Sequence, residues 1–193
     1  PMTRAPSAAL TAVLLATAAC APRPQQDTQV KADLKKLDNE QSPDKLLARG
    51  RMFASMGDLT RAEQYMASAL ERGGDPKTVL PLLLRVCVEA RRYRAAIDYA
   101  EDELKKHPQD ARLRFLVASL YVAIDEPKLA RQHIETVLAA QPADAEAHYV
   151  LAVLLRDQND LVGAAHHFRE YLRLATHGSH ADEARGSLLK SVP

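Results

Sequence analysis

The amino-acid sequence predicts an all-α fold, an α-solenoid of four helix–turn–helix units with a C-terminal capping helix. Composition favours helices, because seven Gly among 193 residues are few for a strand-rich protein, and Leu, Ala, Arg, Lys and Glu dominate. An apolar content of 47% is ordinary for a folded chain. The prediction also depends on a repeat in the sequence and on turn and capping residues that follow the same spacing.

The repeat begins after residue 42 and consists of columns of like residues spaced 34 apart. One column is alanine: Ala62, Ala96, Ala130 and Ala164. A second is leucine: Leu70, Leu104, Leu138 and Leu172. Periods of this length are typical of stacked helical hairpins that bury a continuous core. The four units span 43–76, 77–110, 111–144 and 145–176.

Turn and capping residues place two helices in each unit. Asp75-Pro76 sets a capping side chain before a Pro at the first helical position. Gly57-Asp58, Asp125-Glu126 and Asn159-Asp160 supply turn residues between the helices of their units. The predicted helices are 44–56, 60–72, 77–90, 93–106, 111–124, 127–140, 145–157 and 161–175, with a ninth at 180–191 in the capping segment 177–193. A weaker helix is expected near 28–38, either docked on the first unit or separate from it.

These units resemble the tetratricopeptide repeat, a helix–turn–helix unit of 34 residues. The alanine column matches the Ala at position 20 of that pattern, and the leucine column matches its Leu at position 28. Position 8, where the family has Gly or Ala, holds Gly50, Leu84, Ala118 and Ala152. Position 4 departs from the family's Trp and holds Leu46, Leu80, Arg114 and His148. The resemblance implies a scaffold that binds proteins.

The first nineteen residues have the features of an export signal. Arg4 precedes an uncharged stretch, 5–19, that is short for a membrane span. Cys20 follows Thr17-Ala18-Ala19, which resembles the lipobox of bacterial lipoproteins, in which the Cys is acylated. Ala21 after the Cys favours the outer membrane by the same resemblance. We therefore expect a signal peptide at 1–19, a lipidated tether at 20–42 and a domain facing the periplasm. The alternative is an ordinary cleaved signal with an incidental Cys.

Charge and motif content exclude several functional classes. The chain has 26 Lys and Arg against 25 Asp and Glu, so no basic excess suggests nucleic-acid binding. It contains no G-x-S-x-G, H-E-x-x-H or glycine-rich phosphate loop. Its many carboxylates are expected on outward helix faces. We predict no enzymatic activity, no small-molecule substrate and no cofactor other than the lipid on Cys20.

The cysteine and histidine residues are also assigned structural roles. Cys87 falls at an apolar core position, and acylation of Cys20 leaves it without a disulfide partner. His167 shares a column with Tyr65 and Tyr99, which indicates packing. His177 and His180 flank a helix start. A surface metal site at these two residues is the alternative, and we predict no metal.

The resemblance further implies a concave groove lined by the first helix of each unit at repeat positions 2, 5, 9, 12 and 13. The candidate partner-binding residues there are Leu47, Arg51, Arg85, Val88, Arg112, Phe115, Val122, Tyr149, Val153 and Arg156. Aromatic residues beside Arg are typical of binding hot spots. Alternatively, Phe115 and Tyr149 are partly buried between helices, and the arginines pair with acids such as Glu89 or Asp157.

These observations together predict a non-enzymatic protein-interaction scaffold, anchored by lipid to the bilayer of the outer membrane. Its expected partner is another envelope protein or a peptide segment of one. Leu47 and Arg51 replace the Lys and Asn with which heat-shock co-chaperones of this family hold a carboxylate, so that partner is excluded. The architecture is similar to that of pilotins, which assist type IV pilus secretins. The alternatives are an accessory lipoprotein of β-barrel assembly or peptidoglycan-enzyme regulation, and a self-associating structural protein.

Overall fold

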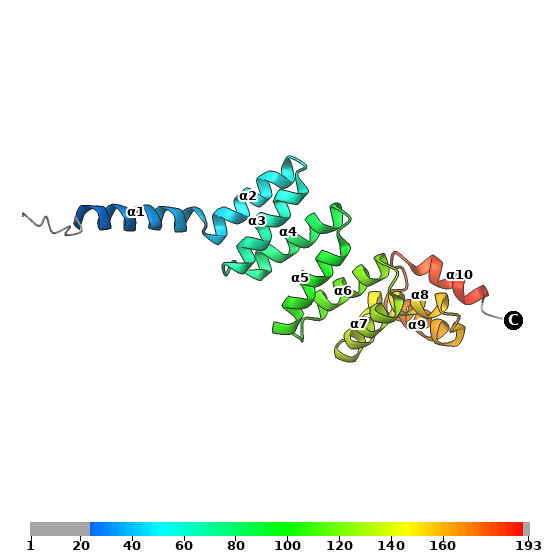
Figure 1. Ribbon diagram of the computed structural model, residues 1–193. Coiled ribbons are helices and arrows are strands. Elements are labelled where there is room, and N and C mark those ends of the chain that lie inside the picture. The colour runs from blue at the N-terminus through cyan, green and yellow to red at the C-terminus, as the bar shows by residue number, and fades with distance from the viewer. Residues whose placement is uncertain (1–23, 191–193) are drawn as a thin grey trace, which may run out of the picture. The chain divides into compact units, whose positions relative to one another are not determined.

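The computed structural model describes residues 24–190, in which helices are joined by short turns and no strand occurs (Figure 1). Its ten helices are α1 (Pro24–Glu40), α2 (Pro43–Ser55), α3 (Leu59–Glu71), α4 (Pro76–Glu89), α5 (Tyr93–Lys106), α6 (Ala111–Ala123), α7 (Pro127–Ala140), α8 (Ala145–Asp157), α9 (Leu161–Leu174) and α10 (Ala181–Lys190). From α2 to α10, every predicted helix boundary agrees with the structure to within one residue. The all-α solenoid prediction is confirmed. The predicted signal peptide, 1–19, and Cys20 lie outside the described residues.

The described residues divide into two parts between Glu40 and Gln41. In the first part, α1 extends beyond the helix expected at 28–38. Its Val30 and Leu34 side chains are exposed. No helix within residues 24–190 combines the length and apolar character needed to cross a bilayer.

The second part, from Gln41 onward, is a series of four helical hairpins, α2–α3, α4–α5, α6–α7 and α8–α9, followed by α10 (Figure 1). Each hairpin corresponds to one repeat unit of the sequence. The alanine column of the sequence is buried in all four hairpins. Small residues let the paired helices approach closely: a Cβ built on Gly50 would lie 2.7 Å from Cγ of Met66. Leu84 holds the equivalent place in α4, and α4 packs less extensively on α5 than the other hairpin helices pack on each other.

All four hairpin turns use the same backbone device. The residue that leaves the first helix has a positive φ in each unit, at Gly57 (77°), Arg91 (57°), Asp125 (60°) and Asn159 (64°). The following N–H reaches back to a carbonyl of the last turn, as Arg92 N does to Cys87 O at 2.7 Å. This arrangement is a Schellman cap, which favours Gly and tolerates Asn and Asp. Three of the turns were predicted, but Arg91 gave no turn signal.

The core residue Cys87 is fully buried as a free thiol, which confirms its predicted packing role. Burial, followed by the nearby Glu63 carboxylate, raises the pKa of the Cys87 thiol to about 12. A thiol that remains protonated is a poor nucleophile.

Helix α10 closes the stack by packing Ala181 and Ala184 against α9. The backbone N–H of His180 donates to the Tyr171 hydroxyl at 3.0 Å, fixing the approach to the helix. On the outer side, Asp182 and Arg185 form an exposed ion pair at 2.8 Å. The polar outer face and apolar inner face are those that a terminal cap requires.

Candidate protein-interaction surface

The first helices of units 2 to 4 are each positioned by an aspartate at the amino end. Asp75, Asp110 and Asp144 accept hydrogen bonds from backbone N–H groups in the first turns of α4, α6 and α8. Such caps satisfy donors that the helix leaves free and set where the helix begins. Because the caps follow the repeat, equivalent positions on these helices present corresponding faces.

We define the first-helix face as the exposed side chains of α2, α4 and α6. Two of its apolar residues, Val88 and Val122, stand 34 residues apart and are 38% and 46% exposed. Leu116 on α6 is exposed to a similar degree. Isolated exposed apolar residues are common, but Val88 and Val122 recur at one repeat position, and Val88 stands one helical turn from Arg85. The face therefore combines apolar contact area with cationic groups.

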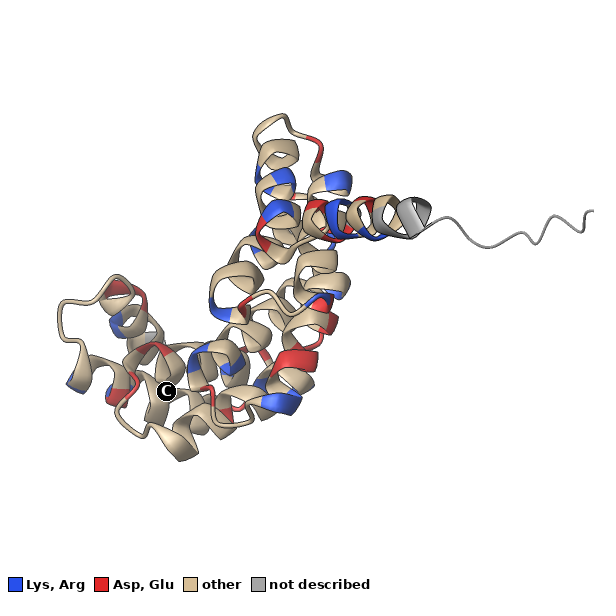
Figure 2. Ribbon diagram, turned by 90° about the vertical axis from the view of Figure 1, so that its left-hand side faces the viewer, with Lys and Arg blue, Asp and Glu red and all other residues tan. Residues whose placement is uncertain are grey.

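The arginines of this face are Arg51, Arg85 and Arg112, all exposed. Within residues 24–190, no ion pair joins any of the three to a carboxylate. The alternative in which groove arginines pair with acids holds for Arg156, which pairs with Asp157 at 3.1 Å. On the rest of the helical hairpins the charges are mixed, and Figure 2 shows basic and acidic residues dispersed over the helices. These three guanidinium groups are thus available to an external carboxylate.

Two predicted groove residues of the fourth unit are engaged by α10 instead. The Tyr149 hydroxyl donates to Oε2 of Glu183 at 2.6 Å, and the Tyr149 ring stacks on His180 at a centroid distance of 3.9 Å. Arg156 Nη1 lies 3.2 Å from Oε1 of Glu183 and its Nε lies 3.1 Å from Oδ1 of Asp157. Burial and the Glu183 carboxylate raise the pKa of Tyr149 to about 12. These side chains fix the cap.

Three further predicted groove residues lie partly or wholly inside the core. Leu47 is buried in α2. Phe115 and Val153 are half-buried and pack against the core cluster of units 3 and 4. The structure therefore keeps Arg51, Arg85, Val88, Arg112 and Val122 on the exposed first-helix face and adds Leu116, whose exposure the repeat pattern did not predict.

Two carboxylates depart from the expectation that acids lie on outward faces. Glu63 is 5% exposed, and its Oε2 lies 3.1 Å from Nη1 of Arg92. Glu103 is 8% exposed and pairs with Lys106 at 3.2 Å. Each buried acid is paired with a cation whose side chain reaches solvent, which offsets the cost of its burial. Residues 24–190 contain no group of three or more His, Cys, Asp or Glu arranged to hold a metal ion.

The sequence matches the tetratricopeptide repeat family over residues 85–133 and 118–179. The chain therefore contains a tetratricopeptide-repeat region at residues 85–179. No curated protein matches it. Among solved structures it is similar to a tetratricopeptide repeat protein from Parabacteroides merdae, with 22% identity and a TM-score of 0.67 over 78% of this chain. It covers only 60% of that longer chain.

Two other solved structures share the fold. MamA (residues 41 to the end) from Desulfovibrio magneticus is 20% identical, with a TM-score of 0.60 over 73% of this chain and 80% of that one. YrrB, described as a tetratricopeptide protein with an unusual peptide-binding site, is 20% identical, with a TM-score of 0.59 over 80% and 84% of the two chains. At these identities the likeness shows the fold alone. The fold is an α-solenoid of stacked helical hairpins, an architecture that presents extended surfaces.

Proposed function

We propose that this tetratricopeptide-repeat protein is a non-enzymatic adaptor that binds an envelope protein through its first-helix face. The proposal depends on the exposed arginines of this face. Within the described residues, Arg51, Arg85 and Arg112 form no ion pair with a carboxylate, and the same face carries exposed Val88 and Val122. A partner segment with acidic and apolar side chains fits this chemistry. Because the helices are already in place, binding orders few residues and costs little entropy.

The proposed location is the periplasmic side of the outer membrane, with Cys20 carrying the lipid. Several acyl chains on one residue give stable anchoring, since each buried methylene contributes about 0.8 kcal/mol. The anchor raises the effective concentration of the adaptor near membrane partners. A secretin of the type IV pilus system is our leading candidate partner. A β-barrel assembly factor and a peptidoglycan enzyme are the alternatives.

The first test is crosslinking in living cells followed by affinity purification and mass spectrometry. The intact protein is compared with an Arg85→Glu/Arg112→Glu variant, which reverses charge on the first-helix face without touching the core. The control is Arg169→Glu, an exposed arginine on α9. We expect an envelope protein with the intact chain and the control, and its loss with the double variant. Equal recovery from all three forms would disprove the role of this face, and recovery of only the protein itself would favour self-association.

A separate test addresses the anchor. Replacing Cys20→Ser should move the protein from the membrane fraction to the soluble periplasmic fraction, because the acylated thiol is lost. Retention of the serine variant in the membrane fraction would show that the anchor lies elsewhere. The two tests are independent, since the arginine variants should still fractionate with the membrane.

A further inference from the structure

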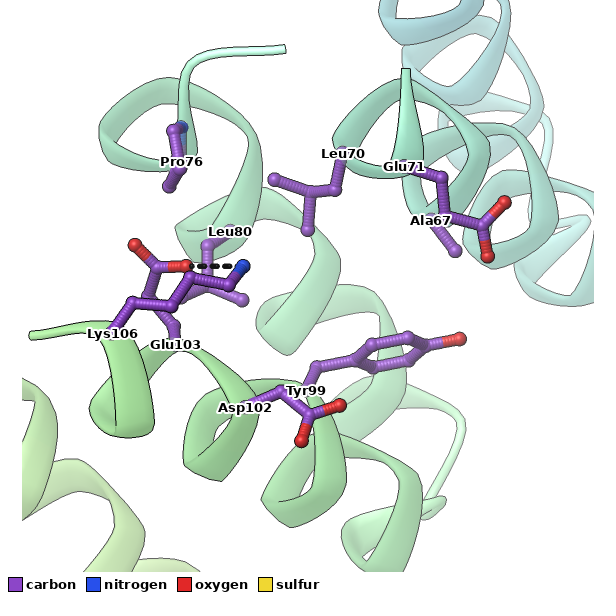
Figure 3. Close-up of a pocket in the computed structure, with 9 residues that line it drawn as sticks. All are labelled: Ala67, Leu70, Glu71, Pro76, Leu80, Tyr99, Asp102, Glu103 and Lys106. Atoms are coloured by element: carbon purple, nitrogen blue, oxygen red, sulfur yellow. Dashed lines mark hydrogen bonds and ion pairs between the residues drawn. The ribbon is translucent and has the colours of Figure 1, made fainter. Parts of the chain in front are cut away.

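A pocket of about 210 Å³ opens between α3, α4 and α5, where the first hairpin, α2–α3, meets the second, α4–α5 (Figure 3). It is lined by Ala67, Leu70, Glu71, Pro76, Leu80, Tyr99, Asp102, Glu103 and Lys106. Sites for drug-sized molecules measure roughly 300–1,000 Å³. This pocket is smaller and suits a single long side chain. None of its residues belongs to the first-helix face.

The walls of the pocket combine apolar surface with carboxylates. Leu70, Leu80 and the Tyr99 ring provide the apolar part. Glu71 and Asp102 lie on the Tyr99 side, and Glu103 lies on the opposite side with its dashed bond to Lys106 (Figure 3). Of the nine lining residues three are acidic and one is basic. The local charge therefore favours a cation.

The carboxylates keep acceptor capacity that the chain itself does not use. Within residues 24–190 no cation pairs with Glu71. Asp102 binds Lys105 at 2.7 Å through Oδ1 alone, which leaves Oδ2 without a partner in the same part of the chain. Glu103 is held by Lys106 and, at 3.4 Å, by His107. A second cation could therefore be bound on the Glu71 and Asp102 side without displacing Lys106.

Helix ends add to this preference. α3 ends at Glu71 and α5 ends at Lys106, so two carboxyl ends flank the pocket. Carboxyl ends carry the negative pole of the helix dipole and attract cations. The amino end of α4, at Pro76, also borders the pocket, but the Asp75 carboxylate caps it. The net field of the three termini thus has the same sign as the side-chain charge.

The repeat itself indicates which cation fits. At the next two junctions, the residue equivalent to Leu80 is a nitrogen donor that binds the carbonyl of the preceding unit's closing proline. Arg114 Nη2 donates to Pro108 O at 2.7 Å, and His148 Nε2 donates to Pro142 O at 3.0 Å. At the first junction the equivalents are Leu80 and Gly74, so the chain supplies no such donor.

We propose that this pocket binds an arginine side chain of a protein partner. The apolar walls would cover the methylene stem, and the planar guanidinium would lie against the Tyr99 ring at the rim, where Glu71 and Asp102 add negative charge. Arginine is favoured over lysine because its fork can bind two carboxylate oxygens at once and stacks on aromatic rings. The site is independent of the proposed groove partner and lies on a different set of residues.

The test is NMR titration of the full chain with the blocked tripeptide acetyl-Gly-Arg-Gly-amide. We expect saturable shifts of the Ala67 and Leu70 methyl signals and the Tyr99 ring signals. The matching Lys peptide should bind more weakly, and the Glu and Leu peptides should cause no saturable shift. Equal binding of the Lys peptide would overturn the guanidinium assignment, and absence of saturable shifts with the Arg peptide would overturn the site.

Two variants extend the test. Glu71→Gln/Asp102→Asn should weaken binding of the Arg peptide about fivefold, as expected for the loss of two partly exposed ion pairs. The control Glu89→Gln, on α4 outside the pocket, should leave binding unchanged. Leu80→Arg reproduces the arrangement of Arg114 and should block the peptide by filling the pocket from within. Unaltered binding to either pocket variant, with native helix content, would contradict the proposal, whatever the outcome for the first-helix face.

Discussion

The Nδ1 atoms of His148 and His167 lie 2.9 Å apart and join the two helices of the fourth hairpin. The bonding implies the protonation states. Nε2 of His148 lies 3.0 Å from the Pro142 carbonyl oxygen, which can only accept, so this nitrogen carries a hydrogen. In a neutral His148 the Nδ1 then accepts, and Nδ1–H of His167 donates. Protonating both rings would set two N–H groups and two positive charges against each other.

Acid should therefore destabilise the fourth hairpin. Burial and the neighbouring His148 and His166 lower the pKa of His167 to about 4, despite the opposing Glu135 on α7 and Glu170 on α9. The unfolded chain, with a His pKa near 6.5, binds more protons in this interval, so stability present above pH 6.5 is lost as the pH falls toward 4. After allowance for partial exposure, the loss is about 1 kcal/mol.

Urea denaturation between pH 7.5 and pH 4 measures this effect. His167→Tyr, which restores the residue of the first two units, should remove much of the pH dependence. His177→Ala, an exposed histidine, should leave it unchanged. A pH profile identical in the His167 variant and the intact protein would show that the pair does not control acid stability.

The turn at Arg91 should be improved by glycine. Its φ of 57° is a left-handed conformation that costs a side-chain-bearing residue free energy, and the equivalent residue of the first unit is Gly57. Arg91→Gly is expected to raise the free energy of unfolding by about 0.5–1 kcal/mol. Arg94→Gly, in the first turn of α5, should instead lower it by about 0.5 kcal/mol. Thermal or urea denaturation distinguishes the two, and destabilisation by both would contradict the strain at Arg91.

Gly50 should not tolerate even a methyl group. A Cβ there would lie 2.7 Å from Met66 Cγ and 3.2 Å from the Ala62 carbonyl oxygen, so the first hairpin would have to open. Gly50→Ala is expected to destabilise the protein by about 1–3 kcal/mol through overpacking. Gly186→Ala is the matched control, since nothing lies within 4 Å of its Cβ, and it should be neutral or stabilising. Equal unfolding midpoints for the two variants would refute the close approach.

The cap depends on the hydroxyl of Tyr149. Tyr149→Phe removes the 2.6 Å bond to Glu183 and keeps the ring stacked on His180. We expect amide hydrogen exchange in α10 to accelerate about fivefold, corresponding to about 1 kcal/mol for one hydrogen bond. Glu183, whose pKa is lowered chiefly by this bond, should titrate at higher pH in the variant. Tyr93→Phe should change neither quantity, and unchanged exchange in Tyr149→Phe would mean that the apolar contacts alone hold α10.

The repeat pattern predicted the helices well because capping and turn residues are local signals. Asp75, Asp110 and Asp144 act as the caps that such residues favour. The pattern missed Arg91 because its left-handed conformation comes from the close of α4 and its packing on α5 rather than from a residue type that favours it.

The candidate surface was predicted less completely. Repeat position alone could not show that Tyr149 and Arg156 bind Glu183, since that contact depends on where α10 docks. The pocket at the first junction was also missed, although its signal was present in the column that contains Leu80, Arg114 and His148. That signal is interpretable only once the proline carbonyls are seen to accept from this position.

The helices that pack most extensively are consecutive in the chain, from α2 to α10. Every strong contact therefore closes a short loop, so the folding barrier should contain little loop entropy and the domain should fold rapidly. The same connectivity makes the molecule modular along its length. Removing residues 77–110 in frame would join α3 to α6 across a junction of the same register. The solenoid would lose one hairpin, and the remaining hairpins would keep their own turns and caps.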